Sequence, residues 1–183
     1  MKKILQIISS VNGSESFSSK LSGIILERLL SIYPSSSVHT RNLTKNPFPH
    51  LEDIHFSALY KPEESRTEED KKALLPSNEA IKEVQEADII VIGVPLYNFG
   101  IPSTLKAWVD HITRAGVTFR YDENGPQGLL TDKKVYLAIS SGGIYSEGPM
   151  KSYDFTEPYL KTILGFIGLT DISVFRIEGT LVA

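Results

Sequence analysis

The sequence predicts a single α/β domain, residues 1–183, built on a parallel β-sheet that lies between layers of helices. Two observations support this prediction. Short apolar segments alternate with longer segments of helical spacing along the whole chain, which is the pattern of β-α-β units. Residues 88–94 are almost entirely β-branched or apolar, and a strand without polar alternation is covered on both faces.

The first third of the chain is predicted to contain two strands and one helix. Residues 4–8 form a short apolar run that stops at Ser9 and Ser10, which indicates a buried strand followed by a loop. The helix is expected because apolar residues recur at helical spacing, at Leu21, Ile24, Ile25, Leu29 and Ile32. Residues 38–43 are predicted as a short edge strand.

The middle of the chain is predicted less completely. Residues 47–60 contain scattered aromatic residues and two prolines, and no element is assigned to them. Thr67 and Asp70 have the spacing of a helix capping box on a solvated face, and Pro76 is expected to kink or split that helix. After the strand at 88–94, Pro102 suits the first position of a helix whose apolar stripe runs to Ile112.

The last third continues the alternation with a strand at 135–139, a helix at 159–166 and a strand at 172–177.

Composition excludes several classes of function. A formal net charge of −3 gives no field that would attract nucleic acid or anionic lipid. The chain has no cysteine, which excludes disulfides, thiolate catalysis, Fe–S clusters and Cys-based zinc sites. No segment approaches the roughly 20 apolar residues of a membrane helix. The apolar run after Lys2 and Lys3 is too short for a signal peptide. We therefore expect a cytoplasmic protein.

Three predicted strands end in unusual loops, at residues 9–19, 95–102 and 140–148. In an open parallel sheet, ligands bind beyond the carboxyl ends of the strands. We therefore expect the three loops to lie together along one edge of the molecule.

The first loop is rich in serine and leads into a helix. A helix start offers free N–H groups and a partial positive charge, and serine hydroxyls add donors for phosphate oxygens. The loop has no Lys or Arg, and the chain has neither a P-loop nor a G-x-G dinucleotide fingerprint. A single terminal phosphate fits this neutral loop, although serines that only cap the helix would give the same pattern.

The second and third loops suit a flat ring. Tyr97 and Phe99 flank Asn98, so aromatic faces could stack on a heteroaromatic ligand while the amide reads its edge. Gly142 and Gly143 would let backbone N–H groups approach closely. Taken alone, each loop has a simpler interpretation: the aromatic residues of the second loop would only pack, and the glycines of the third loop would only form a turn. Together, the three loops match flavin mononucleotide (FMN), which has one phosphate and one flat ring.

Other chemistries have less support. The sequence has no G-x-S-x-G elbow, the motif that would mark Ser140 or Ser141 as a nucleophile. The four histidines do not have the spacing of metal ligands. Asp110 and His111 are neighbours on a helix that point in different directions, and we expect both at the surface or in an interface.

At these loops the sequence is similar to the FMN-dependent NADH-azoreductase family, within the flavodoxin-like quinone reductases. The stretches that carry the resemblance are V-P-L-Y-N-F at 94–99, R-A-G-V-T-F-R-Y at 114–121, E-N-G-P at 123–126, G-G-I at 142–144 and L-G-F-I-G at 164–168. The match keeps the same order from residue 3 to residue 179. It implies a three-layer, doubly wound flavodoxin-like fold with a five-stranded parallel sheet in the order 2-1-3-4-5. It also implies a homodimer with two active sites at the interface.

The resemblance also implies which residues bind FMN. Those for the phosphate are Ser10, Ser16, Phe17 and Ser18. Those for the ring are Pro95, Leu96, Tyr97, Asn98, Phe99, Ser140, Ser141, Gly142 and Gly143. Phe119 and Tyr121 would border the partner's pocket. No metal and no catalytic side chain is implied, because the flavin carries the chemistry.

Four features depart from the family pattern. Phe17 stands where the family usually has Gln, which puts one polar contact in doubt. Leu96 replaces a frequent Met, and Ser141 replaces a common Arg, so the charge near the flavin could differ. Family members normally continue past the last strand into a closing helix, whereas this chain stops at Ala183. Two interpretations stay open: the sequence is truncated, or the closing helix is missing and one sheet face is less covered. In the second case we expect reduced stability or a compensating interface.

By resemblance the mechanism is ping-pong, in which NADH or NADPH gives a hydride to FMN and leaves before an acceptor enters. One cycle would reduce a quinone, and two would cleave an aromatic azo bond. The preferred nucleotide and the physiological acceptor stay open. Two alternatives also remain: a non-catalytic flavodoxin-like electron carrier that docks on protein partners, and a module of the same fold without flavin. A net charge of −3 is weak for a carrier that is steered electrostatically.

Overall fold

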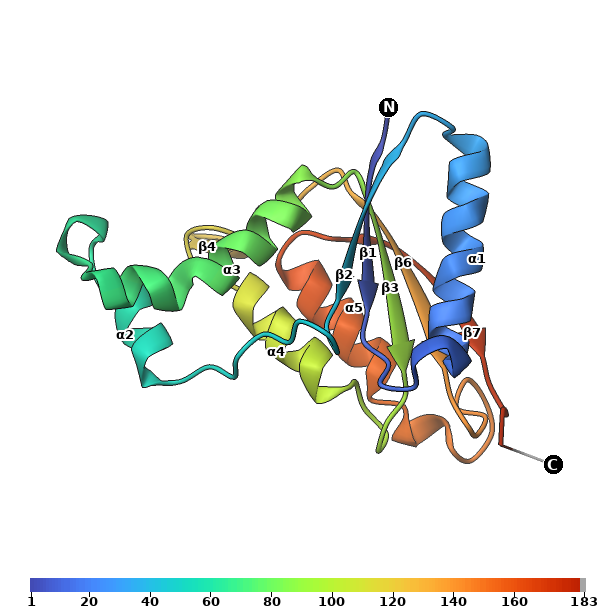
Figure 1. The fold of residues 1–183 in the computed structure, drawn as a ribbon. Helices are drawn as coiled ribbons and strands as arrows, with labels where there is room; N and C mark the ends of the chain where they lie inside the picture. The colour runs from blue at the N-terminus through green and yellow to red at the C-terminus, as the bar shows by residue number, and fades with distance from the viewer. Residues whose placement is uncertain (182–183) are drawn as a thin grey trace.

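The short apolar segments of the sequence form the strands of one parallel sheet in the computed structural model, which describes residues 1–181 (Figure 1). These strands are β1 (Lys3–Ile8), β2 (Ser37–Asn42), β3 (Ile89–Pro95), β6 (Lys134–Ser140) and β7 (Asp171–Ile177). Their order is β2-β1-β3-β6-β7, with every neighbouring pair parallel. The predicted α/β fold and the order 2-1-3-4-5 are therefore confirmed.

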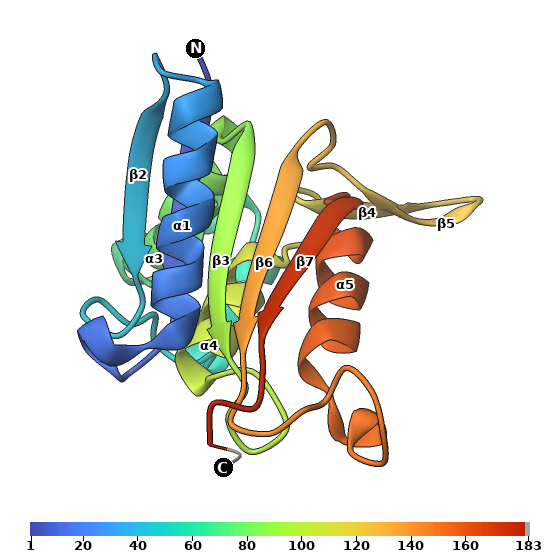
Figure 2. The ribbon, with the colours of Figure 1, turned by 90° about the vertical axis from the view of Figure 1, so that its right-hand side faces the viewer.

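The helices form a layer on each face of the sheet. They are α1 (Phe17–Ile32), α2 (Asp53–Tyr60), α3 (Glu68–Glu86), α4 (Ser103–Ile112) and α5 (Thr156–Phe166), with short 3-10 turns η1 (Gly13–Glu15), η2 (Glu63–Ser65) and η3 (Lys151–Tyr153). Helix α1 covers one face, whereas α3, α4 and α5 cover the other (Figure 2). Helix α2 and the start of α3 extend from the sheet as an arm (Figure 1). In residues 1–181, no helix is both long and apolar enough to cross a membrane.

Strand β3 connects the two cores of the molecule. All of its residues are buried, as expected for a strand covered on both faces. Ile90, Ile92 and Val94 face the larger core, which is shared with α3, α4 and α5. Ile89 and Val91 face the smaller core under α1.

The face that carries α1 is less covered over β7. Within the described part of the chain, α1 is the only helix on this face (Figure 2). Phe175 of β7 is 46% exposed there and lies 6.2 Å from Tyr136, centroid to centroid. The expected effect of this exposure on stability stays a prediction.

The start of helix α3 and the kink at its proline agree with the predictions, except at Asp70. The capping box is present, because Thr67 accepts the N–H of Asp70 and the Asp70 carboxylate accepts the N–H of Thr67. Most of residues 63–72 are exposed, as predicted for a solvated face, but Asp70 is fully buried and binds Lys61. Pro76 does not split the helix, whose axis bends instead (Figure 1). Buried residues on both sides of the proline outweigh its missing hydrogen bond.

Residues 47–60, which had no assignment, contain α2 and place Pro49 and His55 against His111 of α4. The prediction of a surface position for His111 is wrong, because this side chain is only 2% exposed. Its Nε2 lies 2.9 Å from the carbonyl oxygen of Pro49, and its ring meets that of His55 edge-on. Burial therefore lowers the pKa of His111. Pro102 is the N-cap of α4, one residue before the predicted position.

The structure also contains an antiparallel hairpin that was not predicted. Strands β4 (Phe119–Asp122) and β5 (Gly125–Gly128) pair with each other and not with the main sheet. The hairpin projects from the side of the molecule near β7 (Figure 2).

Candidate functional site

The three predicted loops lie side by side at the carboxyl edge of the sheet (Figure 1). We call residues 9–16 the first loop, residues 96–102 the second loop and residues 141–155 the third loop. They follow β1, β3 and β6, which are neighbours in the sheet. The hydroxyls of Ser10 and Tyr97, 3.1 Å apart, connect the first and second loops. The N–H of Leu96 donates to the Ser140 carbonyl at 2.7 Å, where β6 leads into the third loop.

The first loop places the start of α1 at this edge. Ser16 is the N-cap of α1, and its Oγ accepts the N–H of Ser19 at 3.2 Å. The hydroxyls of Ser16 and Ser18 are buried and hydrogen-bonded to each other at 3.0 Å. The first N–H groups of a helix have no partner within the helix. Hydroxyl and N–H donors therefore gather at a neutral helix start, which suits a phosphate group.

Gly93 brings α1 close to the sheet. A Cβ atom at this position would lie 3.2 Å from the carbonyl oxygen of Ser18 and 3.4 Å from Oγ of Ser22. The buried hydroxyl of Ser9 donates to the Gly93 carbonyl at 2.7 Å. Gly93 in β3 and Ser9 after β1 therefore determine how closely the start of α1 approaches the ends of these strands.

Phe17 follows the N-cap and has a different environment from the serines. Its side chain is 45% exposed, and the Lys20 ammonium lies 5.7 Å from its ring centroid. The ring has no hydrogen-bonding atom, so only the backbone N–H of Phe17 can donate to a ligand here.

The second loop turns sharply at its tip. Tyr97 and Gly100 exchange two backbone hydrogen bonds of 3.0 Å around Asn98 and Phe99, whose φ angles are 49° and 68°. Positive φ at both central residues defines a type I′ turn. A phenylalanine rarely adopts this conformation, and such strain concentrates at functional sites. Pro95, the buried last residue of β3, leads into the loop.

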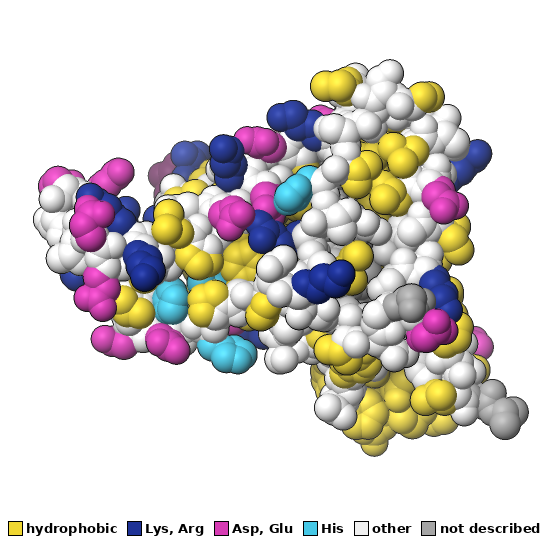
Figure 3. Space-filling model, in the orientation of Figure 1, with side chains coloured by type: hydrophobic (Ala, Val, Ile, Leu, Met, Phe, Trp, Pro, Cys, Tyr) yellow, Lys and Arg dark blue, Asp and Glu magenta, His cyan; other side chains and the backbone are white. Residues whose placement is uncertain are grey.

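The third loop supports this turn. The ring of Phe99 lies between those of Tyr145 and Tyr153, at centroid distances of 6.3 Å and 5.3 Å. The N–H of Phe155 donates to the Phe99 carbonyl at 3.0 Å. Figure 3 shows hydrophobic side chains gathered at this lower edge of the molecule. Contacts with the third loop therefore hold the Phe99 turn.

The start of the third loop is a tight glycine turn. Ser140 and Ser141 are buried, and the Ser141 hydroxyl donates to the Gly143 carbonyl at 2.8 Å. A Cβ on Gly142 would lie 2.8 Å from the Leu181 side chain, and one on Gly143 would lie 3.1 Å from the Tyr145 ring. Side chains larger than hydrogen therefore do not fit at these two positions without movement of their neighbours.

Phe119 and Tyr121 do not join the three loops within one chain. They lie on the hairpin, where their rings meet edge-on at 5.8 Å, and Tyr121 is 70% exposed. The hairpin stands apart from the carboxyl edge (Figure 2).

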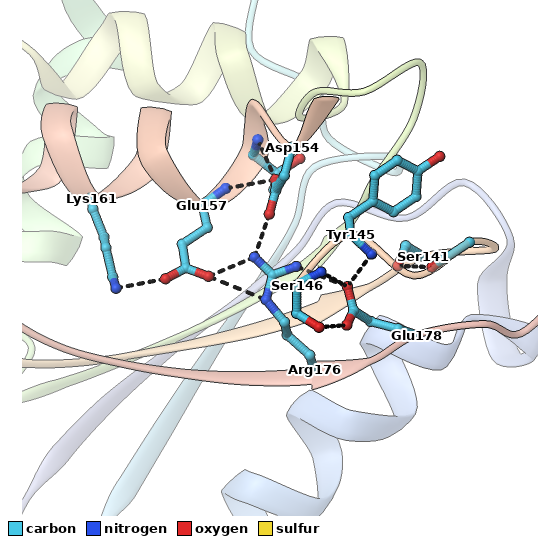
Figure 4. A network of polar contacts seen from close by, with 10 residues as sticks. Ser141, Tyr145, Ser146, Asp154, Glu157, Lys161, Arg176 and Glu178 are labelled. Carbon is cyan, nitrogen blue, oxygen red and sulfur yellow. Dashed lines mark hydrogen bonds and ion pairs between the residues drawn. The ribbon is translucent and has the colours of Figure 1, made fainter. Parts of the chain in front are cut away.

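A polar cluster beside the third loop was not predicted. Arg176 of β7 contacts the carboxylates of Asp154, Glu157 and Glu178 (Figure 4). Burial alone would raise the pKa of Glu178, but hydrogen bonds from Ser146 and the Tyr145 N–H lower it. Asp154 and Glu157 lie 22 and 19 positions before Arg176, and Tyr145 lies 33 positions before Glu178, so no local pattern marks these contacts. Among the described residues, no group of three His, Asp or Glu side chains could hold a metal ion.

Comparison with known proteins agrees with this architecture. A family described as having the flavodoxin-like fold matches residues 2–183. An FMN-dependent NADH:quinone oxidoreductase from Herminiimonas arsenicoxydans is 46% identical over 98% of this chain and 88% of its own length.

Solved structures give the same result. The crystal structure of an azoreductase from Bacillus anthracis str. Sterne aligns over 99% of this chain and 88% of its own, with a TM-score of 0.92 and 32% identity. An FMN-dependent NADH-azoreductase from Bacillus anthracis str. Ames Ancestor, solved in complex with FMN, aligns over 99% and 89% with a TM-score of 0.89 and 30% identity. This chain therefore belongs to the flavodoxin-like fold family, in the branch of the FMN-dependent NADH:quinone oxidoreductases and azoreductases.

Proposed function

We propose that this protein is an FMN-dependent oxidoreductase that uses NADH or NADPH to reduce quinones and to cleave aromatic azo compounds. The observation that carries the proposal is the meeting of three loops at one edge. A hydroxyl-lined helix start lies at one end of this edge, and a strained aromatic turn lies at the other. The family membership and the names of the relatives support the same activity.

The residues at this edge fit FMN. Two buried hydroxyls and the free N–H groups of the α1 start are donors without a counter-charge, which suits a phosphate dianion. Gly142 and Gly143 add no side chain of their own to this edge, while the side chains of Leu181 and Tyr145 lie against them. When bound, FMN would supply the redox chemistry, accepting a hydride and passing electrons to the acceptor.

Each predicted residue has a role in this proposal. Ser10, Ser16 and Ser18 bind the phosphate with their hydroxyls, and Phe17 contributes only its N–H. The ring is held by residues of the second and third loops, namely Pro95, Leu96, Tyr97, Asn98, Phe99, Ser140, Gly142 and Gly143. The Ser141 hydroxyl donates to the Gly143 carbonyl within its own turn, so Ser141 shapes this turn and can meet the ring only as a hydrogen-bond acceptor.

The order of substrates follows from one shared surface over the ring. A nicotinamide and an aromatic acceptor would need the same apolar edge, so one must leave before the other enters. Initial rates measured at several NADH and quinone concentrations should therefore give parallel double-reciprocal lines. Intersecting lines would contradict this ping-pong scheme.

The first test is a visible absorption spectrum. Purified protein is mixed with FMN, excess FMN is removed, and NADH is added without oxygen. We expect a retained flavin band that NADH bleaches and that a quinone or an azo dye restores. A retained band that NADH leaves unchanged would instead fit an electron carrier. Loss of all flavin would contradict the cofactor site.

We also infer a homodimer in which the hairpin of each subunit borders the partner's site. Exposed Tyr121, and Phe119 beside it, would then contact substrate at that site. Light scattering at micromolar concentration should give twice the chain mass of 20.3 kDa. A monomer would exclude this role for the hairpin. A cytoplasmic location stays a prediction.

A further inference from the structure

The end of β7 anchors both ends of the third loop. Glu178 accepts the N–H groups of Tyr145 and Ser146, each at 3.0 Å, and also the Ser146 hydroxyl. These contacts hold the loop shortly after its glycine turn. The carboxylate is 12% exposed, so water competes little for the hydrogen bonds that it accepts.

Arg176 extends the anchor to the other end of the loop. Its guanidinium donates to Glu178 at 3.2 Å and also to Asp154 and Glu157 (Figure 4). Asp154 in turn accepts the N–H groups of Thr156 and Glu157, at 2.8 Å and 3.3 Å, and so caps the start of α5. One guanidinium therefore joins β7, the loop and α5.

The anchored loop supports the strained turn of the second loop. Tyr145 follows the glycine turn directly, and its ring contacts that of Phe99. Near the other anchor, the ring of Tyr153 and the N–H of Phe155 also contact Phe99. Phe99 has a φ of 68°, a conformation that persists only where neighbours enforce it. A displacement of the third loop would thus release the Phe99 turn.

We propose that Arg176 and Glu178 are positioning residues, which act through the third loop to hold the ring end of the cofactor site. This inference rests on the proposed function. Among the described residues, the side chains of Arg176 and Glu178 form hydrogen bonds with the third loop and the start of α5, and not with a predicted cofactor-binding residue. They therefore act through the third loop. A role restricted to stability of the α5 region is the alternative that an experiment must separate from this one.

The test compares Glu178→Ala and Glu178→Gln with Asp70→Asn. Asp70 is the matched control, because it is also a buried carboxylate that binds a cation, a backbone N–H and a hydroxyl, but it lies in the remote arm. Hydrogen exchange of the cofactor-free proteins is measured first. Loss of the three hydrogen bonds that the Glu178 carboxylate accepts from the loop should speed exchange in residues 141–155 by about 10- to 100-fold in Glu178→Ala. Glu178→Gln keeps an acceptor oxygen and should show a smaller change.

FMN affinity is measured next, by quenching of flavin fluorescence. We expect Glu178→Ala to raise the dissociation constant about tenfold, Glu178→Gln to raise it less, and Asp70→Asn to leave it unchanged. Faster exchange without any change in affinity would overturn the inference and leave only a structural role. Equal losses in Glu178→Ala and Asp70→Asn would overturn it as well. If wild-type protein binds no FMN, the proposed function fails, and the inference fails with it.

Discussion

The two ends of the predicted cofactor site are built in different ways. At the phosphate end, Ser16, Ser18 and Ser19 lie within four positions of one another, and a single helix start sets their geometry. At the ring end, the Phe99 turn depends on rings and N–H groups contributed by residues about 45 to 55 positions later. The first end is local in sequence, whereas the second is assembled by the tertiary fold.

This difference has consequences for stability and electrostatics. The phosphate end contains hydroxyls and backbone dipoles. Among residues 1–181, the only ion pair near it joins the exposed side chains of Glu15 and Lys20. The ring end is held by Arg176 and three carboxylates. We therefore expect changes in helix packing to affect the phosphate end most, and changes in charge to affect the ring end most.

Replacement of Gly93 by valine should have the largest effect. Even a Cβ would lie 3.2 Å from the Ser18 carbonyl, so the larger side chain must push the α1 start away from the sheet. We expect about 1–3 kcal/mol of destabilisation and complete loss of FMN binding. Thermal unfolding and fluorescence titration would measure both. A Gly93→Val protein that binds FMN normally would show that the α1 start does not form the phosphate end.

Replacement of Ser16 by aspartate should separate helix capping from phosphate binding. Aspartate caps a helix as well as serine does, so stability should be kept. Its negative charge would repel a phosphate, and we expect FMN to bind about 30- to 100-fold more weakly. Ser16→Ala is the matched variant, which should lose about 1 kcal/mol of stability with a smaller change in affinity.

Riboflavin, which has no phosphate, provides the control for this experiment. Its affinity should be the same in wild type and Ser16→Asp. A parallel loss for riboflavin and FMN would place the ring, and not the phosphate, beside Ser16.

The same contrast explains what the sequence could predict. Apolar runs and helical spacing predicted a parallel α/β sheet, and the serine loop predicted the α1 start, because these features are local. The strand order was implied only by the family resemblance. The capping of α3 was also predicted, since Thr67 and Asp70 lie three positions apart. Bulk burial and short-range hydrogen bonds leave a pattern that one sequence can show.

The features that were missed depend on contacts between distant residues. Burial of His111 results from packing of residues 47–60, which have no periodic pattern. The type I′ turn lacks the usual glycine, so Asn98 and Phe99 did not indicate it. The role of Glu178 follows from its contact with N–H groups 32 and 33 positions earlier in the chain. No spacing of residues in the sequence predicts such a contact.

Low pH should weaken the ring end before the phosphate end. Burial opposes ionisation of Glu157 and Glu178, but their hydrogen bonds and ion pairs lower both pKa values. The pKa of a glutamate in an unfolded chain is about 4.3. A carboxylate whose pKa is lower than this in the folded protein stabilises the fold above that pH. This stabilisation is lost as the pH falls through the pKa of the folded state. Asp70 remains largely ionised at about pH 3, because hydrogen bonds from Lys61 and Thr67 lower its pKa to about 2.

Hydrogen exchange of the cofactor-free protein, corrected for its intrinsic pH dependence, would test this prediction. Between about pH 5 and pH 3 we expect protection to fall in residues 141–155 and to persist in residues 16–20. Glu178→Gln should show a weaker pH dependence in the same loop. Equal loss of protection at both ends would remove the electrostatic distinction between them.

The smallest effect is expected where the two ends meet. The hydrogen bond between the hydroxyls of Ser10 and Tyr97 is the side-chain link between the first and second loops among the described residues. Tyr97→Phe removes this bond and keeps the aromatic ring, so stability and FMN affinity should each change by about 1 kcal/mol, or about fivefold in affinity. Ser10→Ala breaks the same bond from the other side and serves as the matched variant. If the ends are built independently, neither variant should alter exchange in residues 141–155. A large increase there would show that the phosphate end also positions the ring end, because the hydroxyl pair would then transmit order from the helix start to the Phe99 turn.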